Sequence, residues 1–256
     1  MSEHRLLFFD LESAPIPTYV WGAHDQYVRP DALERDTYLL SWASKWSDRK
    51  RVQSAVVTPE EAMDDDDGRI VAELADIMRD ADSVVAHNAK RFDVPLMNAR
   101  LLQLGLEPLG PVRVIDTLSW ARQSFKLASN SLDYLAWLLG VDGKLPTDFN
   151  LWRRSDKGDE KALKRMARYN RRDVEVLEAV YYKLLPYAVG VPRLVDADPD
   201  GNRGVCSRCG EDALQKRGFH YTAASTYQRY QCTHCKKWDR DRKAISERKL
   251  DTVPLR

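Results

Sequence analysis

The chain has 256 residues, which is room for one large domain and a small appendage. It carries 40 Lys and Arg against 39 Asp and Glu, but the net charge of +1 hides a split, because basic residues gather before Asp173 and again in the C-terminal tail. No apolar run reaches the length of a membrane span, and no segment resembles a targeting signal. Composition therefore excludes a membrane-spanning protein, and we expect a cytoplasmic one with no membrane partner.

The first predicted element is a buried strand over residues 5–12, where an apolar run is interrupted by Asp10 and Glu12. Side chains alternate along a strand, so these two carboxylates point the same way. Burying both is costly unless they are paired, protonated or bound to a cation, and a hard divalent ion prefers oxygen ligands. The alternative is a strand end whose acids face solvent.

Further strands are predicted near residues 37–46 and 51–57. The run Asp64–Gly68 follows, and we expect a solvated loop that caps a helix over Ile70–Met78. A calcium loop would need ligands at alternating positions, which this run does not continue.

The middle of the chain predicts a strand at 83–86, a turn at His87 and Asn88, and a helix from Phe92 to Leu104. Asp93 then falls in the first turn of that helix, at the lip of the sheet. The alternative for Asp93 is an acid favoured there by the helix dipole alone.

A strand at 112–115 precedes a long amphipathic helix over Asp159–Leu185. Tyr169 and Asp173 lie four residues apart and are neighbours on its apolar face. The alternative for Asp173 is an ion pair with Arg172 or Lys164 on a solvated face. Basic residues crowd the approach to Asp173, which favours phosphate contact over a merely solvated helix face. The predicted core-facing residues of this helix are Met166, Tyr169, Asp173, Val176, Leu177, Val180 and Leu184.

The tail is predicted to be a separate module. Linker residues at 192–204 divide a domain over 1–191 from a module over 205–256 with a basic tail. Two C-x-x-C pairs about twenty residues apart have the spacing of a four-cysteine zinc ribbon, with a strand over 223–231 entering the second pair. Two disulfides are the alternative, but nothing marks the chain for secretion. The cysteines are Cys206, Cys209, Cys232 and Cys235.

Taken together, three segments resemble the DEDD superfamily of 3′–5′ exonucleases, the DnaQ-like proofreading nucleases, in the subclass with a tyrosine in the third motif. The matches come in the family's order as Asp10-x-Glu12, His87-Asn88-x-x-x-Phe92-Asp93 and Tyr169-x-x-x-Asp173. The resemblance covers about residues 5–187 and is nearest to stand-alone relatives of family-B polymerase proofreading domains. Smaller matches are the strand-to-helix junction at 115–118 and the short helix over 131–140. The tail is similar to zinc ribbons of DNA-handling proteins.

The resemblance implies a ribonuclease-H-like α/β fold, a mixed sheet flanked by helices, with a small C-terminal zinc ribbon. It also implies two Mg²⁺ or Mn²⁺ ions, with Asp10 bridging them and Glu12 and Asp173 completing the site that activates water. Asp93 would hold the second ion mostly through water, and Tyr169 would orient the attacking water. One Zn²⁺ would occupy the four cysteines, and His87 would be a structural or positioning residue.

The predicted function is a metal-dependent 3′–5′ exonuclease that acts on DNA, with single-stranded 3′ ends preferred, in a bacterial or phage-infected cell. Asn88, Lys144 and Arg172 are expected to contact nucleic acid, and Phe149 or Trp152 could stack on a base. An exoribonuclease or structure-selective nuclease is one alternative, because no motif reads a 2′-hydroxyl. Another is a non-catalytic DNA-binding adaptor led by the zinc ribbon. The ribbon could equally dock a replication or recombination protein, and pathway and oligomeric state stay open.

Overall fold

The computed structural model describes residues 5–22, 24, 27–143, 145–189 and 205–247. These residues form two compact units, a larger one over 5–122 and 126–181 and a smaller one over 123–125, 182–189 and 205–247. The predicted linker at 192–204 lies outside the described residues. Among the helices of the described chain, none combines the length and the apolar character that crossing a membrane requires.

The larger unit is built on a five-stranded mixed sheet, as the sequence predicted. Strand β1 is central, pairing antiparallel with β2 and parallel with β4, while β3 and β5 form the edges in the order β3-β2-β1-β4-β5. Each predicted strand is present to within a few residues. The strands are β1 (Leu6–Ser13), β2 (Leu39–Trp46), β3 (Gln53–Val56), β4 (Ser83–Ala86) and β5 (Arg113–Asp116).

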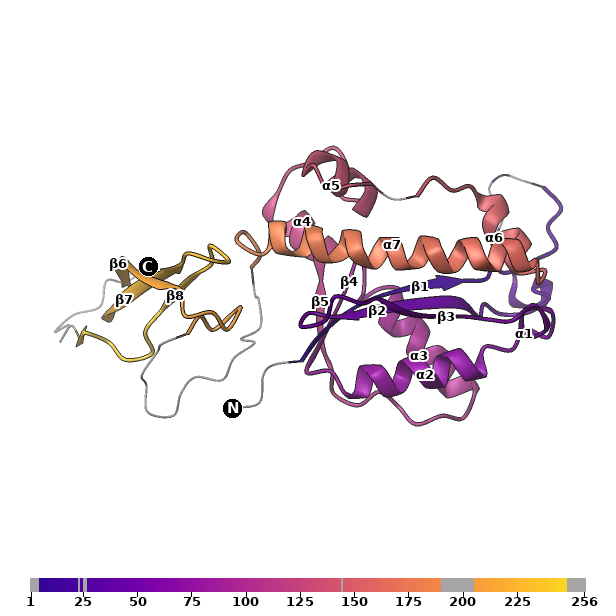
Figure 1. Ribbon diagram of the computed structural model, residues 1–256, viewed down its shortest axis with the longest axis horizontal. Coiled ribbons are helices and arrows are strands. Elements are labelled where there is room, and N and C mark those ends of the chain that lie inside the picture. Colours follow the sequence, from indigo (N-terminus) through magenta and orange to yellow (C-terminus); the bar gives the residue numbers. More distant parts are fainter. Residues whose placement is uncertain (1–4, 23, 25–26, 144, 190–204, 248–256) are drawn as a thin grey trace. The chain divides into compact units, whose positions relative to one another are not determined.

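Helices cover both faces of this sheet. Figure 1 shows α7 lying across one face, with α2 and α3 on the other. The predicted core-facing residues of α7 are all nearly inaccessible, from 0% exposed at Met166 to 7% at Tyr169. The helices are α1 (Pro59–Met63), α2 (Gly68–Arg79), α3 (Asp93–Gln103), α4 (Thr117–Ser124), α5 (Leu132–Leu138), α6 (Phe149–Ser155) and α7 (Glu160–Leu184), and a 3-10 turn spans Pro30–Ala32.

The two faces of β1 have different neighbours because its side chains alternate. Leu7, Phe9 and Leu11 belong to the apolar core that also holds residues of α2 and α3. Phe8 instead meets Tyr181 of α7, with ring centroids 5.1 Å apart. Asp10 and Glu12 have the same parity as Phe8, so β1 directs both carboxylates toward α7.

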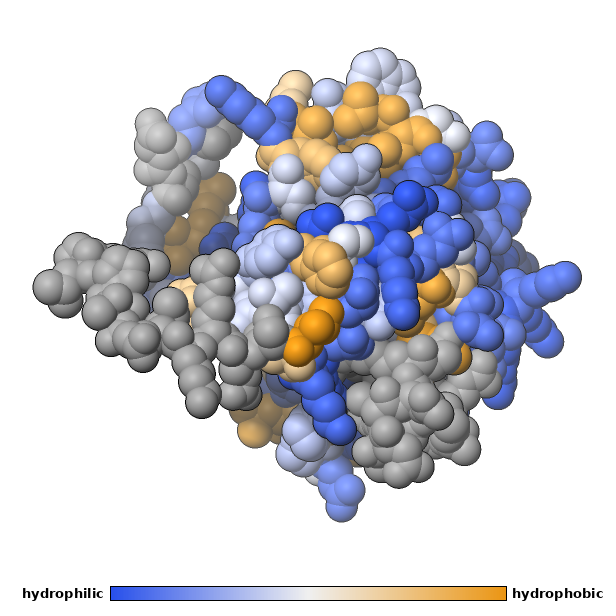
Figure 2. Space-filling view, turned by 90° about the vertical axis from the view of Figure 1, so that its left-hand side faces the viewer, coloured by the Kyte–Doolittle hydropathy of each residue, from blue (hydrophilic) through white to orange (hydrophobic). Residues whose placement is uncertain are grey.

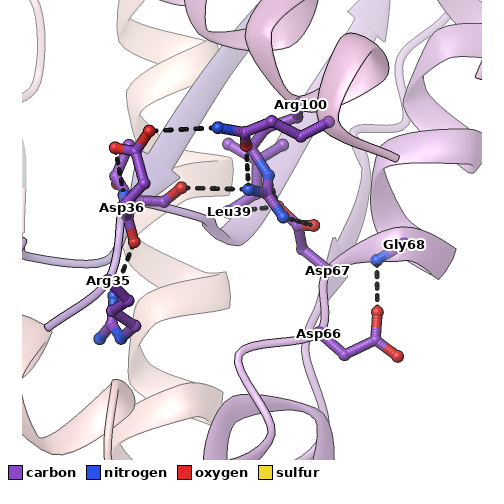
Figure 3. Close-up of polar contacts among 9 residues, drawn as sticks. Arg35, Asp36, Leu39, Asp66, Asp67, Gly68 and Arg100 are labelled. Carbon is purple, nitrogen blue, oxygen red and sulfur yellow. Dashed lines mark hydrogen bonds and ion pairs between the residues drawn. The ribbon is translucent and has the colours of Figure 1, made fainter. Parts of the chain in front are cut away.

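The acidic run before α2 differs from the prediction at one residue. Asp64, Asp65 and Asp66 are exposed, but Asp67 is buried and does not cap α2 with its side chain. Figure 3 shows Asp67 directed toward Arg100 and Leu39, while Asp66 accepts a bond from the backbone of Gly68. A fully solvated loop was therefore wrong for Asp67, because the carboxylate forms an ion pair inside the fold.

The Asp67 ion pair joins three elements. Arg100 of α3 donates from Nη2 to Oδ1 at 2.7 Å and from Nε to Oδ2 at 2.8 Å, and the Leu39 amide at the start of β2 also donates to Oδ2 at 2.7 Å. The side chain of Asp67 is 0% exposed and that of Arg100 is 12% exposed. This buried pair ties α2 and α3 to the sheet, and α3 begins with Asp93.

The smaller unit contains an antiparallel sheet in the order β6-β7-β8, with β9 also paired to β7. Its strands are β6 (Leu214–Tyr221), β7 (Ser225–Cys232), β8 (Trp238–Arg240) and β9 (Ser246–Glu247). Strand β7 covers most of the predicted strand at 223–231 and carries Cys232 at its end. A mixed α/β sheet with a small C-terminal cysteine-containing module is thus confirmed.

Candidate active site and cysteine site

The structure brings together three of the four predicted acidic residues. Asp10 and Glu12 of β1 and Asp173 of α7 each offer a carboxylate oxygen, and these atoms all lie within 4.8 Å of one another. Asp173 is 2% exposed, and Asp10 and Glu12 are partly buried. Carboxylates this close repel one another unless they are protonated or share a cation, and a hard divalent ion suits an all-oxygen donor set.

Asp93 lies outside that group of three but close to β1. It is 2% exposed, and burial, followed by the charge of Asp116, raises the pKa of Asp93 to about 7, while hydrogen bonds from its own amide and, less strongly, from the Leu11 backbone act in the opposite direction. Among the described residues, no hydrogen-bond partner meets Asp93 Oδ2. A buried carboxylate with an oxygen that lacks a protein donor is suited to bind a cation, or a water molecule bound to a cation.

Small residues of β2 lie opposite the two β1 carboxylates. In the β1–β2 register, Asp10 lies opposite Ala43 and Glu12 lies opposite Ser41. Directly opposed residues share a sheet face, so larger side chains at these two positions would fill the space in front of the acids. On the other edge, β4 pairs with β1 only as far as Phe8, which leaves the acidic end of β1 beyond the parallel ladder.

Two neutral donors hold the β1 carboxylates, and the sequence did not identify either one. Asn170 of α7 is 0% exposed and donates from Nδ2 to Asp10 Oδ2 at 2.7 Å. Trp152 of α6 donates from Nε1 to Glu12 Oε2 at 2.9 Å. Each donor engages one oxygen of its carboxylate. Asn170 could have been noticed as a polar residue next to Tyr169 in the third segment, but nothing in the sequence connects Trp152 to Glu12.

Tyr169 stands at the side of this group. It is 7% exposed, lies one helical turn before Asp173, and meets the ring of Trp152 edge-on with centroids 5.8 Å apart. Trp152 therefore contacts both a carboxylate and the tyrosine of the predicted site. The sequence had suggested Trp152 or Phe149 as a surface on which a base could stack, but the Trp152 ring is engaged with Glu12 and Tyr169. Phe149, at the start of α6, is 65% exposed.

Lys164 and Arg172, the two partners that the alternative gave Asp173, form ion pairs with other residues of α7. Lys164 pairs with Glu160, and Arg172 pairs with Glu175. Arg172 also donates to the carbonyls of Asp142 at 2.9 Å and Gly143 at 3.3 Å. Part of its guanidinium thus fixes the loop before α6.

The turn into α3 is organised by Asp116 at the end of β5. This residue is 3% exposed and accepts from the backbone amides of Asn88 at 3.1 Å, Lys90 at 3.3 Å and Ser119 at 3.1 Å. Asn88 adopts a positive φ of 81°, which Asn tolerates better than most residues. Asp116 therefore holds the loop that leads into Asp93. Of the other predicted nucleic-acid contacts, Lys144 lies outside the described residues.

His87 has a structural position. Its Nε2 lies 2.9 Å from the carbonyl oxygen of Asn130, so this nitrogen carries a proton, and its Nδ1 lies 2.9 Å from the hydroxyl of Thr117. The two ring nitrogens therefore connect the residue after β4 to the Asn130 carbonyl and to Thr117 at the start of α4.

The four cysteines form the second candidate metal site. All four are free thiols, with Sγ atoms 3.8 Å apart for Cys206 and Cys235 and 3.7 Å apart for Cys209 and Cys232. A disulfide needs sulfurs about 2.05 Å apart. A tetrahedral zinc with Zn–S bonds of about 2.3 Å places its sulfurs roughly 3.8 Å apart, so this donor set fits such an ion.

The two cysteine pairs use the same turn. Gly210 follows Cys209 with a φ of 78°, and Lys236 follows Cys235 with a φ of 61°. Hydrogen bonds from Cys209 and Cys235 lower the pKa of the Cys206 thiol, and the Arg208 amide, which donates to Cys206 Sγ at 3.4 Å, adds a smaller effect in the same direction. A left-handed residue after each pair lets the chain reverse around the sulfurs.

Comparison with known proteins supports the architecture. The family model RNase_H_2, which describes the RNase H superfamily, matches residues 32–185. This span includes Asp93, Tyr169 and Asp173 but begins after β1. Among solved structures, the chain is similar to the family B DNA polymerase from the hyperthermophilic archaeon Pyrobaculum calidifontis, with a TM-score of 0.55 and 21% identity. The match covers 87% of this chain and 32% of the polymerase, so the chain spans about a third of that protein's length. None of the curated proteins matches.

Proposed function

The chain belongs to the RNase H superfamily, and from this premise we propose that it is a metal-dependent 3′–5′ exonuclease acting on DNA, with single-stranded 3′ ends preferred. The observation that carries the proposal is the convergence of Asp10, Glu12 and Asp173 at the end of a buried strand, with Asp93 nearby. A purely structural role does not account for so many carboxylates in one partly buried place.

We propose that Asp10, Glu12 and Asp173 hold Mg²⁺ or Mn²⁺, with Asp93 contributing mainly through water. Two bound ions would supply a water nucleophile of lowered pKa and would stabilise charge on the leaving 3′ oxygen. The Tyr169 hydroxyl, one turn from Asp173, would orient the attacking water. Asn170 and Trp152 would keep one oxygen of Asp10 and one of Glu12 in place, so that both carboxylates are oriented before an ion binds.

Support for a single-stranded substrate comes from one exposed ring on α6, the helix that carries Trp152. Phe149 lies three residues before Trp152 and is 65% exposed, so its ring can stack on an unpaired terminal base. Asn88, Lys144 and Arg172 remain proposed nucleic-acid contacts. Arg172 also donates hydrogen bonds to the carbonyls of Asp142 and Gly143 in the loop before α6. For the smaller unit, we propose one Zn²⁺ at the four cysteines.

The experiment that tests polarity and substrate together uses four oligonucleotides of one sequence. DNA and RNA strands carry a label at either the 5′ or the 3′ end and are incubated with the protein and Mg²⁺. The proposal expects a descending ladder from 5′-labelled DNA and immediate release of a labelled mononucleotide from 3′-labelled DNA. Faster loss of RNA would make the protein an exoribonuclease, and a ladder from the 3′-labelled strand would reverse the polarity.

A further inference from the structure

One face of the sheet in the smaller unit carries arginines and aromatic rings in alternation. Tyr227 and Arg229 are two residues apart on β7, and Trp238 and Arg240 are two residues apart on β8, so each pair shares a face. In the register, Arg229 lies opposite Arg240, and His220 of β6 lies opposite Tyr227. We call these five residues the arginine–aromatic face.

The side chains on this face stack diagonally. The Arg229 guanidinium lies 4.5 Å from the centroid of Trp238, and that of Arg240 lies 4.0 Å from the centroid of Tyr227. The ring of His220 continues the row, 6.4 Å from Tyr227. Trp238 is 43% exposed, and Arg229 and His220 are also exposed. Each cation is held flat against a ring, so the charges and the rings are ordered before any ligand arrives.

Two positively charged residues lie directly opposite each other on this face. Like charges directly opposite one another in a sheet are unfavourable, and Arg229 and Arg240 stand in this relation. Asp239 of β8 lies opposite Tyr230 and so belongs to the other face of the sheet. A phosphate that accepts hydrogen bonds from either guanidinium would lower the repulsion between the two charges.

We infer that the arginine–aromatic face binds a single strand of nucleic acid, with one phosphate on Arg229, another on Arg240, and bases against Trp238 and Tyr227. A duplex hides the flat faces of its bases, whereas an unpaired strand presents them to aromatic rings. In the view of Figure 2, most of the coloured surface is hydrophilic or neutral and the orange residues form separate groups. Binding of a charged strand needs no broad apolar patch, unlike docking of a hydrophobic protein surface.

The salt dependence of binding tests the role of the arginines. Fluorescence anisotropy of a labelled 30-nucleotide single-stranded DNA is measured with full-length protein carrying Asp10→Asn, so that the strand stays intact whether or not the proposed nuclease function is correct. Each of Arg229→Gln and Arg240→Gln should lower the slope of log Kobs against log salt by roughly 0.7, the value for one phosphate of a single strand. Lys216→Gln removes one charge from the opposite face and should leave the slope unchanged.

The ring contact has its own readout. Trp238→Ala should weaken single-strand binding roughly 5- to 150-fold while Trp238→Phe keeps most of the affinity, the range expected for loss of one stacked base. Zinc content and circular dichroism of every variant show that the unit is folded. Unchanged slopes for both arginine variants, or unchanged affinity for Trp238→Ala in folded protein, would overturn the inference and point to a protein partner instead.

Discussion

Replacing Arg100 with methionine should destabilise the larger unit by about 3 to 5 kcal/mol, the cost of removing one partner of a buried ion pair. The magnitude follows from the burial, because Asp67 is 0% exposed and would retain only the Leu39 amide as a donor. The lost contacts are the two Arg100 bonds at 2.7 and 2.8 Å. An uncompensated carboxylate would then remain between α2, α3 and β2.

The assay is urea unfolding followed by tryptophan fluorescence, since six of the seven tryptophans, all except Trp238, lie in the larger unit. Lys164→Met is the matched control, because it removes the exposed pair with Glu160 and should cost no more than about 0.5 kcal/mol. A loss below about 1 kcal/mol for Arg100→Met would refute the reasoning that this pair is buried and carries the connection between α3 and the sheet.

Three further outcomes are expected. Trp152→Phe keeps an aromatic ring against Tyr169 but removes the hydrogen bond to Glu12, so the Mg²⁺ concentration for half-maximal nuclease activity should rise about 10-fold. Trp137→Phe, at an exposed position, is the control and should leave that concentration unchanged. An unchanged Mg²⁺ requirement for Trp152→Phe would contradict the proposed role of the bond. Without added Mg²⁺ or Mn²⁺, the contribution of Asp93 to the free energy of unfolding should fall as pH rises from 3.8 to about 7, because the folded state retains a proton on Asp93 that the unfolded chain releases. The difference in unfolding free energy between wild type and Asp93→Asn, measured in denaturant titrations, should therefore change with pH in this range, and a constant difference would contradict the assignment. Cys232→Ser should lower the zinc content measured by mass spectrometry well below one ion per chain, and full retention would argue against a four-cysteine site.

The sheet and the acidic residues were predictable because their signals are local. Apolar runs bounded by turn residues identified β1, β4 and β5 to within about a residue, and helical spacing identified the buried face of α7. The order of the three acidic segments then suggested one site, and the structure places Asp10, Glu12 and Asp173 together. The assignment of catalytic roles to these residues stays a prediction.

The parts that could not be predicted depend on contacts between distant segments. Trp152 and Glu12 are 140 residues apart, and Asp67 and Arg100 are 33 apart, so neither pair has a signature in a single sequence. Asp67 was expected in solvent because a run of four aspartates is normally solvated, and only the fold shows that the last of them turns inward. The arginine–aromatic face likewise needed the register of β7 and β8.

The central claim is that the carboxylates of β1 and α7 cut nucleic acid from its 3′ end. The most direct test is the degradation of single-stranded DNA labelled at its 5′ end, with Mg²⁺ or Mn²⁺, by wild-type protein and by Asp10→Asn in parallel. The account predicts a metal-dependent ladder that shortens from the 3′ end with wild type and loss of that ladder, by at least about 100-fold in rate, with Asp10→Asn. No shortening by the wild type, or equal shortening by both folded proteins, would contradict it.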